Sequence, residues 1–296
     1  MKKDAVTQLK KKHKFGVFDV VNYTLLGLIA LIILFPFYNS IIISFLSEKE
    51  FANFNGIWPK SFTLDAYKVI FSDKWVYSGY KNSIIIVVTG TLYSLFITST
   101  CAYAFSRDHF LGRGIIMKLF VFTMFFGGGM IPSYILIKNL GLMDTLLSLI
   151  LPSGMAVYYM LLMRAFFLNI PRSIKEAAMI DGAGEGIILF RIVLPLSKPI
   201  IATVSLFTMV DLWNSWFSAM LYIKSADLRP LQLCLREIIN NSGASTSQLL
   251  LQNVERLNTQ SYTMAAVMVT MLPIMCVYPF LQKHFVKGIM IGGVKE

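Results

Sequence analysis

Six long, almost uncharged apolar stretches limit what this chain can fold into. Each is long enough to cross a hydrocarbon core of about 30 Å, which needs roughly 20 helical residues. Their hydropathy is uniform and lacks the two-residue alternation of barrel strands, so it predicts helices. We therefore expect an all-α integral membrane protein with six transmembrane helices. The stretches cover residues 18–46, 82–106, 115–137, 145–168, 199–223 and 262–282.

The composition fits a membrane protein better than a soluble one. Of the 296 residues, 56% are apolar and 15% are charged, and the mean hydropathy is +0.64. Soluble domains average about 45–50% apolar and about 25% charged residues. The three Cys and three His residues exclude a disulfide framework and have no recognisable metal-ligand spacing. No metal site is predicted.

The net charge of +11 is distributed unevenly along the chain. With the N-terminus inside the cell, the predicted inner segments hold 17 of the 27 Lys and Arg residues, and the inner face carries +10 against +2 outside. This asymmetry obeys the positive-inside rule, so both termini are predicted to be cytoplasmic. The basic excess is then a topological signal, and nucleic-acid binding loses its main support. The first apolar stretch is too long for a signal peptide and is interpreted as a retained helix.

The predicted organisation has a basic cytoplasmic N-terminus over 1–17, a transmembrane domain over 18–282 and a cytoplasmic tail over 283–296. Two long outer loops, 47–81 and 224–261, suit a partner outside the membrane. One substantial inner loop, about 171–195, lies between spans four and five and suits a partner inside the cell.

The inner loop carries its own start and stop signals. Pro171 ends the fourth stretch, and Ser173 has the capping-box spacing to Glu176. Gly182 can stop the short helix that follows. A second amphipathic segment over 187–193 is predicted to end at the Leu194-Pro195 pair. We expect a short helix, a turn and a second helix on the cytoplasmic surface.

The spacing within this loop resembles the EAA loop of ABC-importer permease subunits. Glu176-Ala177-Ala178 is followed by Gly182, and Ile192 and Leu194-Pro195 come at the matching later positions. Asp181-Gly182-Ala183 and Arg191 to Pro195 look like the carbohydrate branch, which includes the second permease of the maltose importer.

The likeness extends beyond the loop. Residues 127–132 and 138–142 resemble the LplC/YtcP-type subgroup of oligosaccharide permeases, Trp213-Asn214 resembles its Trp-Asn motif, and 285–295 resembles the maltose-type tail. The chain departs from the subgroup at Asp211, where a small residue or His is common, and at Tyr159, where Asn is common.

The resemblance implies the type I ABC importer permease fold, with a cytoplasmic coupling helix between spans four and five that seats in a groove of an ATPase subunit. The coupling residues would be Glu176, Ala177, Ala178, Asp181, Gly182, Ile192, Leu194 and Pro195. Gly292 and Gly293 of the tail would contact the ATPase as well.

The implied partners are a second permease subunit, two ATP-binding cassette ATPase subunits, an extracellular solute-binding lipoprotein and the lipid of a bacterial cell membrane. The chain has no phosphate-binding loop of its own. We therefore expect no cofactor on this chain, with ATP and Mg bound by the ATPase subunits.

Asp211 lies within the fifth stretch. A carboxylate that faces lipid is energetically costly, so we expect the Asp211 side chain to face a cavity or a partner. A substrate path could use Asp211, Trp213, Asn214, Trp216 and Tyr159. At about 100° per residue, Asp211 and Asn214 share one helix face and the two Trp residues another, so all line one path only if the helix is kinked. A polar contact between helices and an interfacial Trp belt are the alternatives.

Rival functions fit less well. A membrane enzyme would need clustered carboxylates, a metal motif or a nucleophile with a base, and the sequence has no such set. A secondary transporter more often shows an internal repeat. An ABC permease for a peptide shares the EAA loop but is less consistent with residues 127–132 and the tail. The sequence predicts a non-enzymatic membrane subunit of an ABC importer for an oligosaccharide or related sugar.

Overall fold

The computed structural model describes residues 16–107, 110–241 and 258–293, with side chains through residue 276 in the last range. Every regular element in these ranges is a helix, as the apolar pattern predicts. The longer helices are α1 (Val17–Ser44), α3 (Asp65–Ser72), α4 (Lys74–Ser106), α5 (Arg113–Phe125), α6 (Met130–Asn139), α8 (Val157–Leu168), α9 (Arg172–Ile180), α12 (Lys198–Trp213), α13 (Trp216–Tyr222), α14 (Leu231–Asn241) and α16 (Thr259–Gly293). The shorter ones are α2 (Glu48–Ala52), α7 (Leu147–Ile150), η1 (Leu151–Ser153), α10 (Glu185–Ile187), η2 (Ile188–Val193), α11 (Leu194–Leu196) and η3 (Ala226–Leu228).

Two of the described helices, α1 and α4, are long and apolar enough to cross a membrane without a break. Three further candidates are bent pairs, with bends of 112° between α5 and α6, 44° between α7–η1 and α8, and 85° between α10–α11 and α12. The sixth predicted stretch falls within α16. The apolar stretches therefore correspond to helices, but several of these helices are interrupted.

Glycine accounts for the sharpest interruption. The stretch predicted over 115–137 is divided at Phe126 to Gly129, and Gly129 has a φ of 88°, which favours glycine. A side chain placed at Gly127 or at Gly129 would meet no atom within 4 Å, so close packing at these two glycines does not force the interruption. A run of three glycines lacks the side-chain contacts that would keep a helix continuous.

The stretch predicted over 199–223 is divided at Asn214 and Ser215, between α12 and α13. The Asn214 side-chain amide donates to the carbonyl of Val210 at 2.9 Å, and the Ser215 hydroxyl donates to the carbonyl of Leu212 at 2.7 Å. Short polar side chains that bond to nearby backbone carbonyls compete with the helical pattern. The Trp-Asn motif therefore ends α12 within the predicted span.

Helix α4 is the centre of the packing. It contacts α8, α12 and α14, and it begins at Lys74, eight residues before the predicted apolar stretch. Gly90 permits the approach of α12, because a side chain there would meet Leu212 Cδ1 at 2.7 Å. In the N-terminal half of α4, the side-chain amide of Asn82 donates a hydrogen bond to the carbonyl of Asp227 at 2.7 Å. These contacts make α4 the shared partner of α8, α12 and α14.

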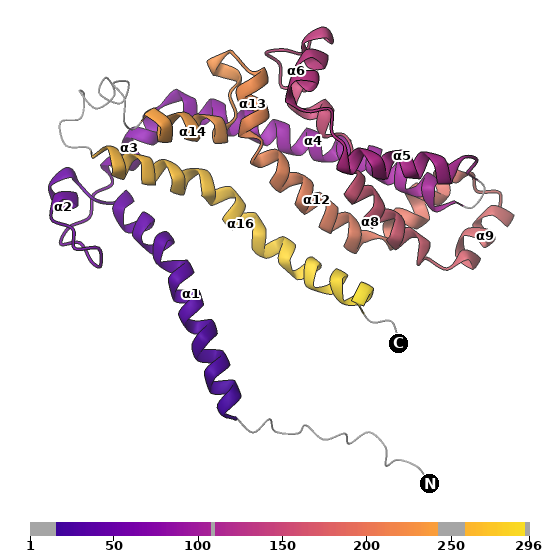
Figure 1. The fold of residues 1–296 in the computed structure, drawn as a ribbon, viewed down its shortest axis with the longest axis horizontal. Coiled ribbons are helices and arrows are strands. Elements are labelled where there is room, and N and C mark those ends of the chain that lie inside the picture. The colour runs from indigo at the N-terminus through magenta and orange to yellow at the C-terminus, as the bar shows by residue number, and fades with distance from the viewer. Residues whose placement is uncertain (1–15, 108–109, 242–257, 294–296) are drawn as a thin grey trace.

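The two ends of the molecule differ in content. Figure 1 shows α9 beyond one end of α4, and α2, α3 and α14 gathered at the opposite end. Helix α1 packs against α16 and leaves most of its apolar side chains exposed, including Leu31 and Ile32. The described parts of the inner loop and of the two long outer loops predicted from the sequence thus lie at opposite ends of the bundle.

Candidate coupling loop and membrane cavity

Helix α9 begins directly after Pro171. The predicted capping box is wrong, because Arg172 is already helical and Ser173 stands at the second helical position. No side chain caps this end, and Pro171 with a φ of −51° begins the helix instead. A serine inside the first turn cannot occupy the N-cap position that a capping box requires.

The end of α9 follows the prediction for Gly182. This glycine has a φ of 81°, and its N–H donates to the carbonyl of Met179 at 3.0 Å. The N–H of Ala183 donates to the carbonyl of Ala178 at 2.9 Å. Together these bonds form the Schellman arrangement that satisfies the last carbonyls of a helix. Asp181 is the exposed C-cap residue.

The second half of the loop is one run of short helices from Glu185 to Leu196. Pro195 does not end it, contrary to the sequence prediction, because it occupies an early position of α11, where a missing N–H is tolerated. The chain turns at Ser197 instead, before α12. Ile192 is half-buried, and Leu194 packs against the apolar core between α4, α8 and α12.

The surface of α9 is divided between the bundle and solvent. Lys175 is buried and its Nζ donates to the carbonyl of Phe167 at 2.9 Å, which ties α9 to the end of α8. Ala178 packs against the same apolar core. On the other side Glu176 and Ala177 are exposed, and Ile180 is 86% exposed. The helix therefore presents an apolar and acidic surface that the described chain leaves uncovered.

A charged cluster that sequence reasoning missed fastens the loop to α4. Arg107 Nη2 lies 2.8 Å from Glu185 Oε1 and 3.4 Å from Met179 Sδ. Tyr103 donates its hydroxyl to the other Glu185 oxygen. Arg164 of α8 also donates to the carbonyl of Phe105 at 2.9 Å. The opposite charges of Arg107 and Glu185 were the only sequence signal for this pairing. The two residues are too far apart in sequence to be neighbours on one helix.

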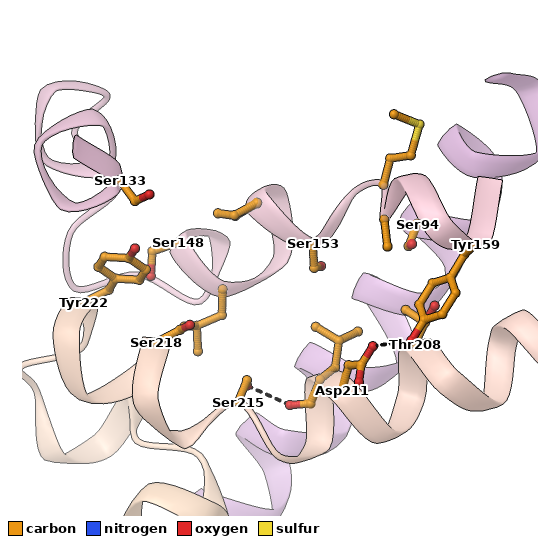
Figure 2. A pocket seen from close by; sticks show the side chains of 15 residues that line it. Ser94, Ser133, Ser148, Ser153, Tyr159, Thr208, Asp211, Ser215, Ser218 and Tyr222 are labelled. Atoms are coloured by element: carbon orange, nitrogen blue, oxygen red, sulfur yellow. Dashed lines mark hydrogen bonds between the residues drawn. The ribbon is translucent and has the colours of Figure 1, made fainter. Parts of the chain in front are cut away.

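The second region is a cavity of about 350 Å³ between α4, α6, α7, α8, α12 and α13. Figure 2 shows Asp211, Tyr159 and Thr208 at one end and Ser133, Ser148 and Tyr222 at the other. The remaining lining residues are Ser94, Leu149, Pro152, Ser153, Met155, Ala156, Leu212, Ser215 and Ser218.

Asp211 and Tyr159 are joined in this cavity. The Tyr159 hydroxyl donates to Asp211 Oδ2 at 2.6 Å, and its ring stacks on Phe207 with 5.7 Å between centroids. The carboxylate projects from α12 about one turn before the break at Asn214. Of the five residues predicted for a substrate path, the structure brings these two together.

The other three face elsewhere. Trp213 is buried with its ring 6.5 Å from that of Tyr80, and the guanidinium of Arg236 lies 4.8 Å from the ring centroid of Trp216. The Asn214 amide bonds to its own helix. Asp211 and Ser215 line the cavity, whereas the two Trp residues do not, and neither does Asn214, which was predicted to share the face of Asp211. Gly292 lies in α16, and Gly293 is its last residue, outside the part whose side chains are described.

A turn near the cavity is held by Asp144, another residue that sequence reasoning missed. Asp144 has a φ of 59°, and its N–H donates to the carbonyl of Tyr222 at 2.8 Å. Its Oδ1 accepts from the N–H groups of Lys224 and Ser225 at 2.9 and 2.8 Å. Hydrogen bonds from Ser225 hold the pKa of this carboxyl below its ordinary value.

Comparison with known proteins agrees with this architecture. The family described as binding-protein-dependent transport system inner membrane component matches residues 16–291. The chain is 44% identical to Protein LplC of Bacillus subtilis (strain 168), over 94% of this chain and 95% of the relative. It is 41% identical to the polygalacturonan/rhamnogalacturonan transport system permease protein YtcP of the same organism, over 95% and 99% of the two chains.

A solved structure agrees as well. One chain of a bacterial ABC transporter involved in the import of the acidic polysaccharide alginate superposes with a TM-score of 0.85 at 32% identity, covering 91% of this chain and 96% of that one. The chain belongs to the binding-protein-dependent transport system inner membrane components, the permease subunits of ABC importers.

Proposed function

We propose that this chain passes an oligosaccharide or related sugar through the membrane, driven by ATP hydrolysis on separate subunits. The observation that carries the proposal is the division of α9. Its inner side is tied to α8 through Lys175, and its outer side exposes Glu176, Ala177 and Ile180. A helix surface that is apolar and acidic, exposed on one side and tied to the bundle on the other, suits a docking partner.

In this proposal α9 is the coupling helix, and Glu176 contacts a basic residue of an ATPase subunit. Ala177, Ala178 and Gly182 allow close approach, Asp181 lies at the rim, and Ile192, Leu194 and Pro195 belong to the segment that returns the loop to the membrane. The Arg107–Glu185 ion pair would transmit a displacement of the loop to α4, because it joins the two directly.

The proposed topology has six spans with both termini in the cytoplasm of a bacterial cell. The charge asymmetry of the sequence supports it, and so does the separation of α9 from α3 and α14 along α4 (Figure 1). Lipid would cover the exposed apolar side chains of α1. The outer loop 224–261 would meet a solute-binding lipoprotein.

The cavity beside Asp211 is the part of the substrate path that we assign to this chain. Its hydroxyl lining and single carboxylate suit sugar hydroxyls, and Tyr159 holds that carboxylate in place. Trp213, Asn214 and Trp216 support the path indirectly, since the break at Asn214 places α13 against it. The path would be completed by a second permease subunit.

The remaining partners in the proposal are two ATPase subunits, which bind ATP and Mg, and the C-terminal tail around Gly292 and Gly293 would contact them. No described feature favours a peptide or another non-sugar solute. A secondary transporter would have no use for an ATPase-docking loop.

Affinity purification of the tagged chain from its native membrane tests the proposal. We expect a second permease subunit and an ATPase subunit to be recovered with it in a constant ratio. We also expect sugar uptake to require ATP. Recovery of the chain alone from gently solubilised membranes, with uptake independent of ATP, would contradict the proposal.

A further inference from the structure

The chemistry of the cavity lining distinguishes between classes of sugar. None of its fifteen lining residues, all within the described chain, is Lys, Arg or His. Its charged member is Asp211. Nine of the others carry a hydroxyl group: six Ser, one Thr and two Tyr. The cavity therefore offers a carboxylate and many hydroxyl oxygens, but no cationic side chain.

Five of the nine lining hydroxyl groups donate a hydrogen bond within the protein. Four of the lining serines donate to backbone carbonyls of their own helical turn at 2.7–2.8 Å, and they are Ser133, Ser148, Ser153 and Ser215. Tyr159 donates its proton to Asp211. A hydroxyl group that donates a hydrogen bond to the protein presents its oxygen lone pairs to a ligand. The cavity is consequently rich in acceptors, and among its other four hydroxyl groups that of Thr208 is buried without a hydrogen-bond partner in the described chain.

This pattern matches a ligand that brings its own donors. A neutral sugar offers O–H groups to serine oxygens and to Asp211 Oδ1, which accepts no hydrogen bond from the described part of the chain. A uronate brings a carboxylate, which accepts hydrogen bonds and needs donors or a cation. Beside Asp211 it would meet a like charge and no cationic side chain among the lining residues.

We propose that the cavity accepts uncharged, hydroxyl-rich sugar units and disfavours uronate units, with Asp211 as the discriminating residue and Tyr159 as the residue that positions it. The inference rests on the proposed function of the cavity as a substrate path. It separates this chain from the relatives whose names specify polygalacturonan or alginate. The mechanism is selectivity by an unfavourable contact with the wrong ligand.

The test compares two ligands that differ in charge and share one backbone: a trigalacturonide with free carboxylates and its fully methyl-esterified form. Binding is measured at equilibrium on the whole importer, purified in nanodiscs without its solute-binding protein, so that the external protein's own preference does not enter. We expect the ester to bind the unaltered importer at least about tenfold more tightly, the size expected for one unfavourable like-charge contact in a partly hydrated site.

Three variants test whether Asp211 causes the difference in affinity between the two ligands. In Asp211→Asn the gap between the two ligands should shrink to about threefold or less, mainly because the free acid binds better. In Tyr159→Phe the carboxylate remains but loses the donor that positions it, so the gap should narrow, but by less than in Asp211→Asn. Asp65→Asn removes an exposed carboxylate of α3 that does not line the cavity, and the gap should stay at its original size.

Equal affinity of the two ligands for the unaltered importer would overturn the proposal, and so would a gap that survives Asp211→Asn. Failure of both ligands to bind would remove the cavity as a sugar site and overturn it as well. The measurement on the unaltered importer needs no variant to fold. A chain that does not assemble with an ATPase would instead contradict the proposed function, and that result is visible before any ligand is added.

Discussion

The inner loop and the cavity are built on the same helix, α4, but by opposite means. The loop is fixed by charged groups, with Lys175 bonded to α8 and Arg107 paired with Glu185. The cavity is lined by neutral hydroxyls around one carboxylate and lies where α12 is interrupted. In the proposed scheme, the loop that couples to the ATPase is held by charged contacts, while the cavity that meets the sugar presents mostly neutral polar groups.

The comparison predicts that changes in the loop lower the uptake of every substrate alike, whereas changes in the cavity alter the ratio between substrates. The largest effect is expected for Glu176→Ala. Uptake should fall at least about tenfold, because truncating one partner of a charged interface contact costs a few kcal/mol. The ATPase subunits should continue to hydrolyse ATP, and the measurement is the number of ATP molecules consumed per sugar imported.

Ser173→Ala is the matched control for that change, since Ser173 is exposed on the same helix and caps nothing. It should leave the ratio of ATP to sugar unchanged. Undiminished uptake by Glu176→Ala would remove the contact assigned to this carboxylate.

The ion pair between the loop and α4 should have the next largest effect. Arg107→Ala and Glu185→Gln, made separately and together, should each lower uptake several-fold without altering substrate preference. Arg107 is well shielded and Glu185 is mostly exposed, so their coupling should be about 1 kcal/mol or less in thermal unfolding. Additive losses in this double-mutant cycle would mean that the two residues do not act together.

A change that strains the backbone at the end of α9 should have a smaller effect, on stability alone. Gly182→Ala should destabilise the turn by about 1 kcal/mol, because the left-handed conformation is unfavourable for a residue with a side chain. Gly184 has a φ of −72°, so Gly184→Ala is the matched control and should be almost neutral. Thermal unfolding of the purified importer distinguishes them, and equal shifts would contradict the assigned role of the Gly182 conformation.

The smallest effect is expected at the turn beside the cavity. The pKa of Asp144 is lowered from its ordinary 3.8, so its bonds to residues 224 and 225 are present at pH above 3.8 and are lost as pH falls through the lowered pKa. Uptake should therefore show no dependence on this group near neutral pH. Asp144→Ala should change the substrate ratio slightly and Asp144→Asn less, since Asn tolerates a positive φ and keeps an acceptor. A larger loss in Asp144→Asn would contradict this.

The sequence predicted the regions that depend on local signals. Apolar length predicted the helices, and Gly182 predicted the end of α9, because a glycine past a helix end is a local requirement. The sequence did not reveal the breaks at Gly129 and Asn214, which apolar averages conceal. Ser173 misled because capping depends on where the helix begins, and here Pro171 begins it.

Long-range contacts were beyond the sequence for a different reason. The Arg107–Glu185 pair and the Asp144 turn join segments about 80 residues apart, and no spacing rule connects such positions. Helical geometry predicted that Asp211 and Asn214 share one face, but Asn214 does not line the cavity with Asp211, because the helix is interrupted there. It could not predict that Tyr159 would come from α8 to meet Asp211.

The exposed side of α9 is proposed to dock on an ATPase subunit. A photo-cross-linking residue at Ala177 can report this contact, because Ala177 is small and exposed beside Glu176. The same residue at Ala226, which is exposed at the opposite end of the bundle, is the control. In native membranes we expect a cross-link from position 177 to an ATPase subunit and none from position 226. Absence of that product at position 177, with the ATPase present in the same membranes, would mean that α9 does not dock there.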